Sequence, residues 1–230
     1  MYVSLVIPMF NEESNILKLL IEIEIVLKTF NKYEIIIVDD NSSDRSYQKV
    51  QEYKNINDKI ILFKNKKNFG QSYSITKGIK NSKYDTIITL DADGQNNPKD
   101  IMKMIEIFFS DDQLELLGGI RNKRRDNKIK IISSKIANGI RSYILKDNCS
   151  DTGCSLKIFK KNTYLDFPYF DGIHRFIPAL YSGYNKKTSF VNVDHRERVS
   201  GKSNYGTLTR LYKGIIDLIR VVLIIRKKNQ

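Results

Sequence analysis

Residues 34–53, EIIIVDDNSSDRSYQKVQEY, contain the unit from which the fold is built. The unit begins with an apolar run at 34–38, continues through acidic and small polar residues at 39–44, and ends in a helical pattern at 44–53. Short runs of Ile and Val bounded by polar residues are typical of strands buried in a sheet. A buried strand followed by an amphipathic helix predicts one step of a parallel α/β sheet.

The same unit recurs along the N-terminal two-fifths of the chain. Further strands are predicted at residues 3–7, 59–63 and 86–90, and further helices at 13–30, 71–80 and 98–109. Later strands are predicted at 114–118, 153–159 and 189–194, with helices ending at 145, at 171–184 and from 207 onward. We therefore expect an α/β protein with a mostly parallel central sheet flanked by helices. Ligands of such sheets bind beyond the carboxyl ends of the strands, where the polar residues lie.

The composition of the 230-residue chain fits one globular domain with a C-terminal helix. Hydrophobic residues make up 41%, which is enough for a core and too many for disorder. The first residues become acidic too early for a secretory signal, and no run of about 18 uncharged apolar residues predicts a spanning helix. Two cysteines, Cys149 and Cys154, predict neither a disulfide framework nor a zinc site. We expect a cytosolic location, with membrane attachment left open.

The net charge of +13 predicts an anionic partner, and the excess is concentrated in residues 121–146 and 195–230. Nucleic acid, anionic lipid and a phosphorylated small molecule all fit that charge. A nucleic-acid-binding module is disfavoured because the chain lacks interleaved aromatic and basic strand residues and any helix-turn-helix or zinc pattern. The absence of a Gly-x-Gly-x-x-Gly or Gly-Lys-Ser/Thr loop also disfavours a dinucleotide oxidoreductase or a P-loop NTPase.

The strongest local signal is DADGQ at residues 91–95, directly after an apolar strand. The carboxylates of Asp91 and Asp93 and the side-chain carbonyl of Gln95 are oxygen ligands that suit Mg²⁺ or Mn²⁺. The same residues also fit an acidic turn that caps the helix predicted from residue 98. In the acidic segment at 39–44, a carboxylate at the end of a strand can accept hydrogen bonds from a base or ribose, or it can cap the next helix. The segment at 8–13 has the same two interpretations, and the residues alone leave both open.

Seven ordered motifs resemble glycosyltransferase family 2. Three of them are VSLVIPMFNEE at 3–13, VDDNSSD at 38–44 and DADGQ at 91–95. Four more resemble the dolichol-phosphate mannosyltransferase branch, namely NFGQSYSITKG at 68–78, SDTGCSLK at 150–157, GIHRFIPAL at 172–180 and HRERVSGKSNYG at 195–206. The resemblance implies a nucleotide-sugar-binding fold of the GT-A type, with a catalytic domain at 1–206 and a separate helix at 207–230.

The resemblance also implies a reaction: metal-dependent, inverting transfer of a hexose, mannose or glucose, from a nucleotide-diphosphate sugar to a dolichyl or undecaprenyl phosphate. It places the enzyme on the cytoplasmic face of a membrane. By resemblance, Mg²⁺ or Mn²⁺ is held by Asp91, Asp93 and Gln95, with Asp91 contacting ribose as the alternative. The nucleotide-sugar set implied in this way is Pro8, Phe10, Glu12, Asp40, Asp91 and Asp93. A relative that uses a soluble saccharide or protein acceptor remains the competing hypothesis.

An acceptor phosphate is mostly dianionic at neutral pH, so it needs positive charge rather than a general base. The acceptor-phosphate candidates are Arg121, His174, Arg175, Arg196, Arg198, Lys202 and Ser203. We predict that Asp93, Arg121, Arg196 and Arg198 form the catalytic set. A solvated basic loop at 196–203 and a structural role for His174 are the alternatives. Asp151 matches an acidic position of the family, as a partner for a sugar hydroxyl or an arginine, and is otherwise a turn residue.

Residues 208–225, LTRLYKGIIDLIRVVLII, form an apolar helical pattern with a narrow polar stripe. The stripe consists of Arg210, Lys213, Asp217 and Arg220, and basic residues 226–228 follow it. This pattern predicts a helix lying in the plane of an anionic membrane surface. The alternative is a helix packed on the domain or on a second subunit, so a homo-oligomer or a membrane partner subunit stays open.

Overall fold

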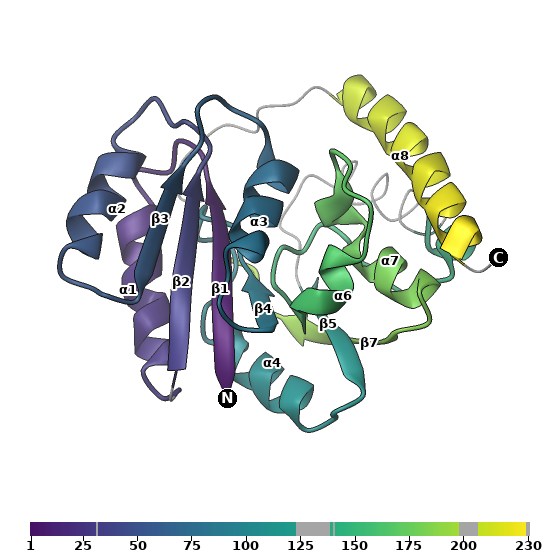
Figure 1. The fold of residues 1–230 in the computed structure, drawn as a ribbon, viewed down its shortest axis with the longest axis horizontal. Helices are drawn as coiled ribbons and strands as arrows, with labels where there is room; N and C mark the ends of the chain where they lie inside the picture. Colours follow the sequence, from purple (N-terminus) through teal and green to yellow (C-terminus); the bar gives the residue numbers. More distant parts are fainter. Residues whose placement is uncertain (31, 123–138, 140, 198–206, 229–230) are drawn as a thin grey trace.

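A computed structural model of the chain describes residues 1–30, 32–122, 139, 141–197 and 207–228. Its strands form one sheet in the order β3-β2-β1-β4-β6-β5-β7 (Figure 1). The strands are β1 (Tyr2–Met9), β2 (Lys32–Asp39), β3 (Ile60–Lys64), β4 (Thr86–Thr89), β5 (Leu114–Arg121), β6 (Lys157–Lys160) and β7 (Lys187–Val193). The predicted α/β class with a mostly parallel sheet is confirmed.

The antiparallel member of the sheet is β6, which lies between β4 and β5 and runs opposite to both. All other neighbours pair in parallel. The strand predicted at 153–159 was placed too early, because residues 154–156 form a loop against the end of β4. There the Thr89 hydroxyl donates to the Ser155 carbonyl at 2.7 Å, and the Asp91 amide donates to the Ser155 hydroxyl at 3.2 Å. Between the end of β4 and this loop, hydrogen bonds of the Thr89 and Ser155 hydroxyls therefore take the place of backbone strand pairing.

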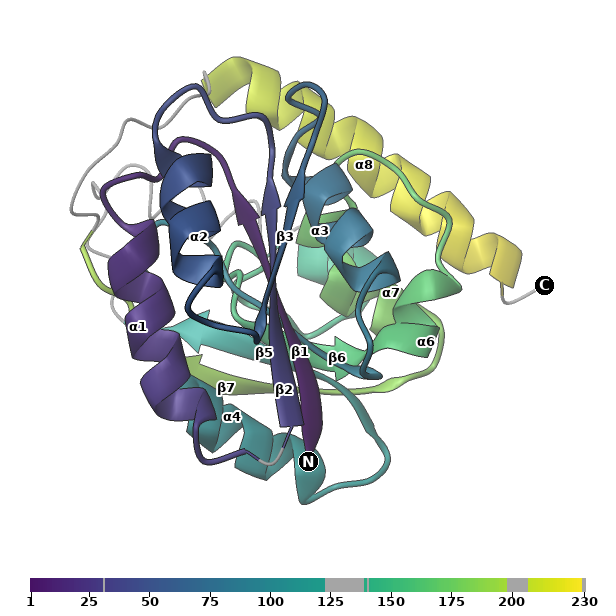
Figure 2. The same cartoon turned by 60° about the vertical axis from the view of Figure 1, so that its left-hand side comes forward.

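Helices cover both faces of the sheet (Figure 2). They are α1 (Ile16–Leu27), α2 (Ser46–Lys54), α3 (Gln71–Lys80), α4 (Asp100–Phe109), α6 (Lys161–Leu165), the 3₁₀ turn η1 (Ile173–Arg175), α7 (Ile177–Gly183) and α8 (Thr207–Lys228). One core joins α1, α2 and α4 to one face of the sheet, and a second joins α3, α6, α7 and α8 to the other. Because both faces of β1 and β2 are buried, the sequences of these strands are nearly continuous apolar runs.

The helix predicted at 171–184 is wrong as a single element, because the structure divides it into η1 and α7. Pro178 lies in the first turn of α7 and has no amide hydrogen, so a continuous helix would leave the carbonyl four residues earlier without its donor. The chain turns instead at Phe176, whose φ and ψ are −112° and 8°.

Helix α8 packs on α7 through one face. Val221 is fully buried, and a Cβ at Gly183 would lie 2.4 Å from the Ile225 side chain, so the two helices approach closely there. The opposite face exposes large apolar side chains, namely those of Ile215, Ile216, Ile219 and Leu223. Among the described helices, none is long and apolar enough to cross a membrane.

Candidate functional site

The carboxyl ends of β1, β2 and β4 meet at one edge of the sheet, as their parallel pairing requires. The Asp40 amide donates to the Met9 carbonyl at 2.8 Å, which ties the end of β2 to the end of β1. Further along, the Ser43 amide donates to the Asn11 side chain at 2.8 Å. The acidic segments that the sequence pointed to are therefore neighbours in space.

Asp40 is a buried carboxylate whose oxygens are already occupied. It accepts hydrogen bonds from the Phe69 amide at 2.9 Å, the Gly70 amide at 2.7 Å and the Asn65 side chain at 2.7 Å. Gly70 has a φ of +91°, which a residue with a side chain rarely adopts. The loop after β3, which the sequence placed least clearly, is thus folded onto Asp40.

The other residues of the predicted nucleotide pocket lie on the same edge. Pro8 and Phe10, at the end of β1, are both half-buried. The half-buried Glu12 accepts a hydrogen bond from the Asn15 side chain at 2.7 Å, and its amide donates to the Ser46 hydroxyl at 2.7 Å. The structure brings these residues together with Asp40, and their contact with a nucleotide stays a prediction.

Asp91 and Asp93 form a closely spaced carboxylate pair after β4. Burial first, and then the nearby charge of Asp93, raise the pKa of Asp91 to about 6. Asp91 accepts one hydrogen bond from Gln71 at 2.7 Å, and the Asp93 carboxylate accepts the Gln95 amide at 3.1 Å. A bound cation would relieve the repulsion between the two acids, so the donor set fits a hard divalent metal. Among the described residues, no cluster of three or more acidic, His or Cys side chains has metal-binding geometry.

The segment after β7 returns to the carboxylate pair. Asn96 forms an isolated bridge with His195, and the Arg196 amide donates to the Gln95 carbonyl at 2.7 Å. The Arg196 guanidinium points to the other side, where it donates to Glu22 at 2.5 Å and to Asn97 at 2.8 Å. The start of the segment after β7 thus lies beside residues 95–97, while the Arg196 side chain bonds to Glu22 of α1 and to Asn97, which precedes α4.

Arg121, at the end of β5, forms a two-pronged ion pair with Asp151. Both of its N–H···O contacts measure 2.7 Å, and both side chains are largely buried. The structure thus gives Asp151 the arginine partner that was one of the two roles open for it. The positive charge of Arg121 also acts on Asp91, where it opposes the larger effects of burial and of Asp93 on the pKa of that carboxyl.

His174 and Arg175 have partners inside the protein. Burial lowers the pKa of His174 to about 3, helped by the charges of Arg175 and Lys157, so the imidazole is neutral at neutral pH. Its Nδ1 lies 2.6 Å from the Ser72 hydroxyl. Arg175 donates to Asp217 of α8 at 2.7 Å. Their contact with an acceptor phosphate stays a prediction, and a neutral His174 supplies no positive charge to it.

Arg198, Ser200, Lys202 and Ser203 lie outside the described residues, as do basic residues 123–135. The predicted acceptor cluster is therefore described only through Arg121, His174, Arg175 and Arg196.

Three residues of the site were not singled out from the sequence. Gln71 donates to Asp91, and Ser155 accepts the Asp91 amide and donates to Asn96 at 2.7 Å. Lys157 is 4% exposed, donates to the Cys154 carbonyl and lowers the pKa of Asp91 by its charge. All three stand inside motifs that carried the family resemblance, which was the available signal.

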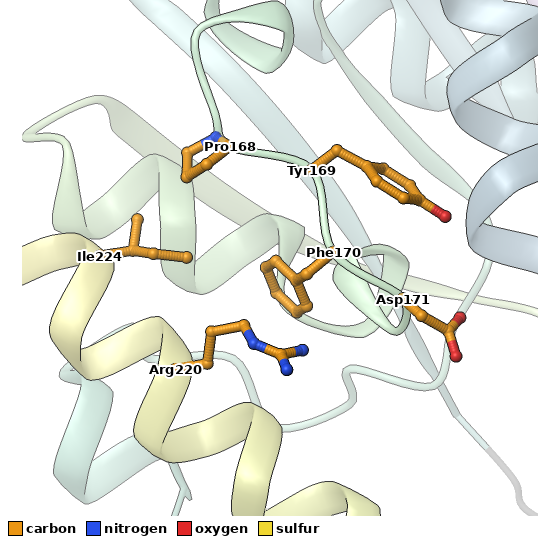
Figure 3. A pocket seen from close by; sticks show the side chains of 6 residues that line it. All are labelled: Pro168, Tyr169, Phe170, Asp171, Arg220 and Ile224. Atoms are coloured by element: carbon orange, nitrogen blue, oxygen red, sulfur yellow. The ribbon is translucent and has the colours of Figure 1, made fainter.

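Two surface hollows lie beside α8 rather than over the carboxylates. One, of about 460 Å³, is lined by Pro168, Tyr169, Phe170, Asp171, Arg220 and Ile224 (Figure 3). The second, of about 400 Å³, runs along the outer face of α8 and shares Arg220 and Ile224 with the first. The shared residues show that the two hollows are neighbours.

Comparison with known proteins identifies relatives over nearly the whole chain. The family model described as Glycosyl transferase family 2 matches residues 4–166. An undecaprenyl-phosphate 4-deoxy-4-formamido-L-arabinose transferase of Edwardsiella ictaluri is 32% identical over 95% of this chain and 67% of its own length. A dodecaprenyl-phosphate galacturonate synthase of Rhizobium johnstonii is 32% identical over 98% of this chain and 68% of its own length. The chain spans about two thirds of these relatives.

Solved structures match the fold. Glucosyl-3-phosphoglycerate synthase from Mycobacterium tuberculosis, in complex with Mn²⁺, UDP and phosphoglyceric acid, has a TM-score of 0.71 and 14% identity, covering 97% of this chain and 78% of its own. The same synthase with Mg²⁺ and UDP has a TM-score of 0.69 and 13% identity, covering 97% of this chain and 79% of its own. At these identities the likeness establishes the architecture, which is the GT-A type expected from the motifs.

Proposed function

The chain belongs to glycosyl transferase family 2, and we propose that this glycosyltransferase moves a sugar from a nucleotide-diphosphate donor to a polyprenyl phosphate. The observation that carries the proposal is the similarity, over 95% of the chain, to a transferase whose name specifies undecaprenyl phosphate. The paired carboxylates beside Arg121 agree with it, because the reaction brings two phosphorylated substrates together.

For the donor, we propose that Asp91, Asp93 and Gln95 hold a divalent metal. The metal, Mg²⁺ or Mn²⁺, would neutralise charge on the leaving diphosphate. Support comes from the repulsion between the two buried acids and from the metal ions named in complexes of the structural neighbour. Asp40, Pro8 and Phe10 are then placed to contact the base and ribose. Gln71 orients Asp91 by donating to one of its oxygens.

For the acceptor, the lipid phosphate oxygen attacks the anomeric carbon as the bond to the diphosphate breaks, which inverts the configuration. No proton has to move, because the phosphate is already ionised. Arg121 is suited to this step, since its guanidinium lies close enough to Asp91 to lower the pKa of that carboxyl. Asp151 fixes the guanidinium in place through both oxygens.

The sugar is the least specified part of the proposal. A hexose is expected from the motif resemblance, whereas the two relatives are named for an arabinose derivative and for galacturonate. We propose mannose or glucose as the first sugars to test, and these other two as the next.

We also propose that the enzyme works on the cytoplasmic face of a membrane, with α8 at the lipid surface. The exposed face of α8 is apolar at Ile215, Ile219 and Leu223, and the helix ends in the basic residues 226–228. That pairing of apolar area with positive charge suits an anionic bilayer. Asp217, which belongs to the predicted polar stripe, faces the protein in this arrangement.

The decisive experiment is a panel of sugar nucleotides with Mg²⁺ or Mn²⁺, tested against undecaprenyl phosphate and against water-soluble saccharides. We expect radioactivity from one donor to enter the lipid fraction in a metal-dependent way. Transfer to a soluble saccharide without polyprenyl phosphate would contradict the proposal and support the competing function.

Membrane attachment is tested by sedimentation with vesicles that contain about 30% anionic lipid. Leu223→Asp places a charge in the outer face of α8 and should reduce the bound fraction at least about tenfold. Ile56→Asp, at a highly exposed apolar residue outside α8, is the matched control and should bind as wild type does. Equal binding by Leu223→Asp and wild type would remove α8 from the lipid surface.

A further inference from the structure

Asp217 is the single acidic residue of α8, and it faces the protein with 6% of its surface exposed. Its two oxygens accept from Arg175 of η1 at 2.7 Å and from Arg220 of its own helix at 3.0 Å. Figure 3 shows Arg220 extending from α8 toward Phe170, and its guanidinium lies 5.4 Å from the centre of that ring. A buried carboxylate with two arginine partners fixes how α8 sits on the domain.

The Asp217 carboxylate also lies close to the backbone of Gly172. A Cβ at this residue would lie 2.6 Å from an oxygen of Asp217 and 2.7 Å from a guanidinium nitrogen of Arg175. Gly172 has a φ of +99°, so both its space and its conformation require glycine. Because of this close approach, the position of the Gly172 amide depends on the ion pair beside it.

Gly172 in turn contacts the first turn of α3. Its amide donates to the Ser72 hydroxyl at 2.9 Å, and Ser72 is fully buried. The Ser72 hydroxyl also forms a hydrogen bond with Nδ1 of the neutral His174 imidazole, at 2.6 Å. Ser72 is thereby held from two sides by the η1 segment.

The residue before Ser72 reaches the carboxylate pair, since Gln71 donates to Asp91 at 2.7 Å. We propose that Asp217 is a positioning residue for the reaction: its ion pairs fix Gly172 and η1 against α3, so that Gln71 holds Asp91 in its working orientation. The helix that we place at the lipid surface is thus connected to the carboxylates by consecutive contacts. The activity part of this inference rests on the proposed function.

The test is a double-mutant cycle between Asp217→Asn and Gln71→Ala, measured by transfer turnover and, separately, by Mn²⁺ affinity. Asp217→Asn keeps the side-chain shape and removes the charge. We expect kcat to fall about tenfold and Mn²⁺ to bind about threefold more weakly, because small displacements of reacting groups are costly. The KM for the lipid reports separately on Arg175, the acceptor candidate that pairs with Asp217, and the positioning role predicts a larger change in kcat than in this KM. In the Gln71→Ala background, Asp217→Asn should change either quantity less than about twofold.

Additive effects in the cycle would overturn the proposal, as would wild-type turnover and Mn²⁺ affinity in Asp217→Asn. If Asp217→Asn does not fold, Arg220→Gln takes its place in the cycle. It removes the Asp217–Arg220 ion pair and leaves the Asp217–Arg175 pair, and its effects should be non-additive with Gln71→Ala in the same way. Asp112→Asn, at an exposed residue, is the matched control and should behave as wild type. If wild-type enzyme transfers nothing to polyprenyl phosphate, the proposed function fails, while the Mn²⁺ cycle still decides the role of Asp217.

Discussion

The two acidic sites at the carboxyl edge of the sheet balance their charge in different ways. Asp40, after β2, accepts three hydrogen bonds from the loop that follows β3. Asp91 and Asp93, after β4, repel one another, and burial raises the pKa of Asp91 to about 6. At Asp40 the loop after β3 supplies the hydrogen bonds, whereas at Asp91 burial and the charge of Asp93 outweigh the opposing charges of Lys157 and Arg121. The difference distinguishes a carboxylate held by the loop after β3 from a pair that we propose to bind a cation.

The N-terminal turn of α3 touches both sites. The amides of Phe69 and Gly70 bond to Asp40, and the side chain of Gln71 bonds to Asp91. Any displacement of this turn therefore acts on both carboxylate sites. Substitutions at one site or the other distinguish their roles by stability and by turnover.

Replacing Asp93 should produce the largest effect. Asp93→Ala removes one ligand of the proposed metal, and we expect turnover to fall at least about a thousandfold, since a bound metal supplies several kcal/mol of charge stabilisation. The measurement is sugar transfer at saturating donor with Mg²⁺ or Mn²⁺, together with Mn²⁺ binding. Turnover equal to wild type would show that the pair is an acidic turn and holds no metal.

Replacing Asp40 and Asp91 in parallel should change stability in opposite directions. Asp40→Asn exchanges an acceptor oxygen for an amide that faces a donor, and should lower the free energy of unfolding by about 2–3 kcal/mol. Asp91→Asn removes the repulsion and should raise it by about 1–2 kcal/mol at pH 7 without metal, while reducing transfer. Urea denaturation of both variants checks the signs. A loss of stability in Asp91→Asn would contradict the account of that site.

The sequence was sufficient for the sheet and for the position of the acidic sites. Strands of Ile and Val followed by acidic residues placed Asp40, Asp91 and Asp93 at the ends of β2 and β4, because parallel pairing leaves little alternative. The resemblance assigned Arg196 to the acceptor phosphate, and the structure shows that its amide bonds to the Gln95 carbonyl. Hydrophobic periodicity and the order of the motifs were therefore enough to predict the strands that carry these acidic residues.

What the sequence did not reveal depends on contacts between distant segments. The inward orientation of Asp217 could not be deduced from a polar stripe, because a stripe does not say which side of a helix meets the protein. Gln71 and Ser155 were overlooked since polar residues at such positions usually face solvent. Pro178 was a local sign of the break between η1 and α7, but the helical spacing of the apolar residues led to the prediction of one continuous helix.

The pH dependence of stability concerns His174, which contacts the same turn of α3. Its folded pKa of about 3 lies below the ordinary value of 6.5, so the unfolded chain binds the proton first as the pH falls. The contribution of His174 to the free energy of unfolding is therefore fully present above pH 6.5 and is lost progressively below it. Between pH 6.5 and 5 the loss should be about 2 kcal/mol. In His174→Asn the side-chain carbonyl still accepts from Ser72 and cannot titrate, so urea denaturation should show a flatter acid limb. The same slope in both proteins would mean that His174 takes up its proton as readily in the folded protein as in the unfolded chain, which would contradict the lowered pKa.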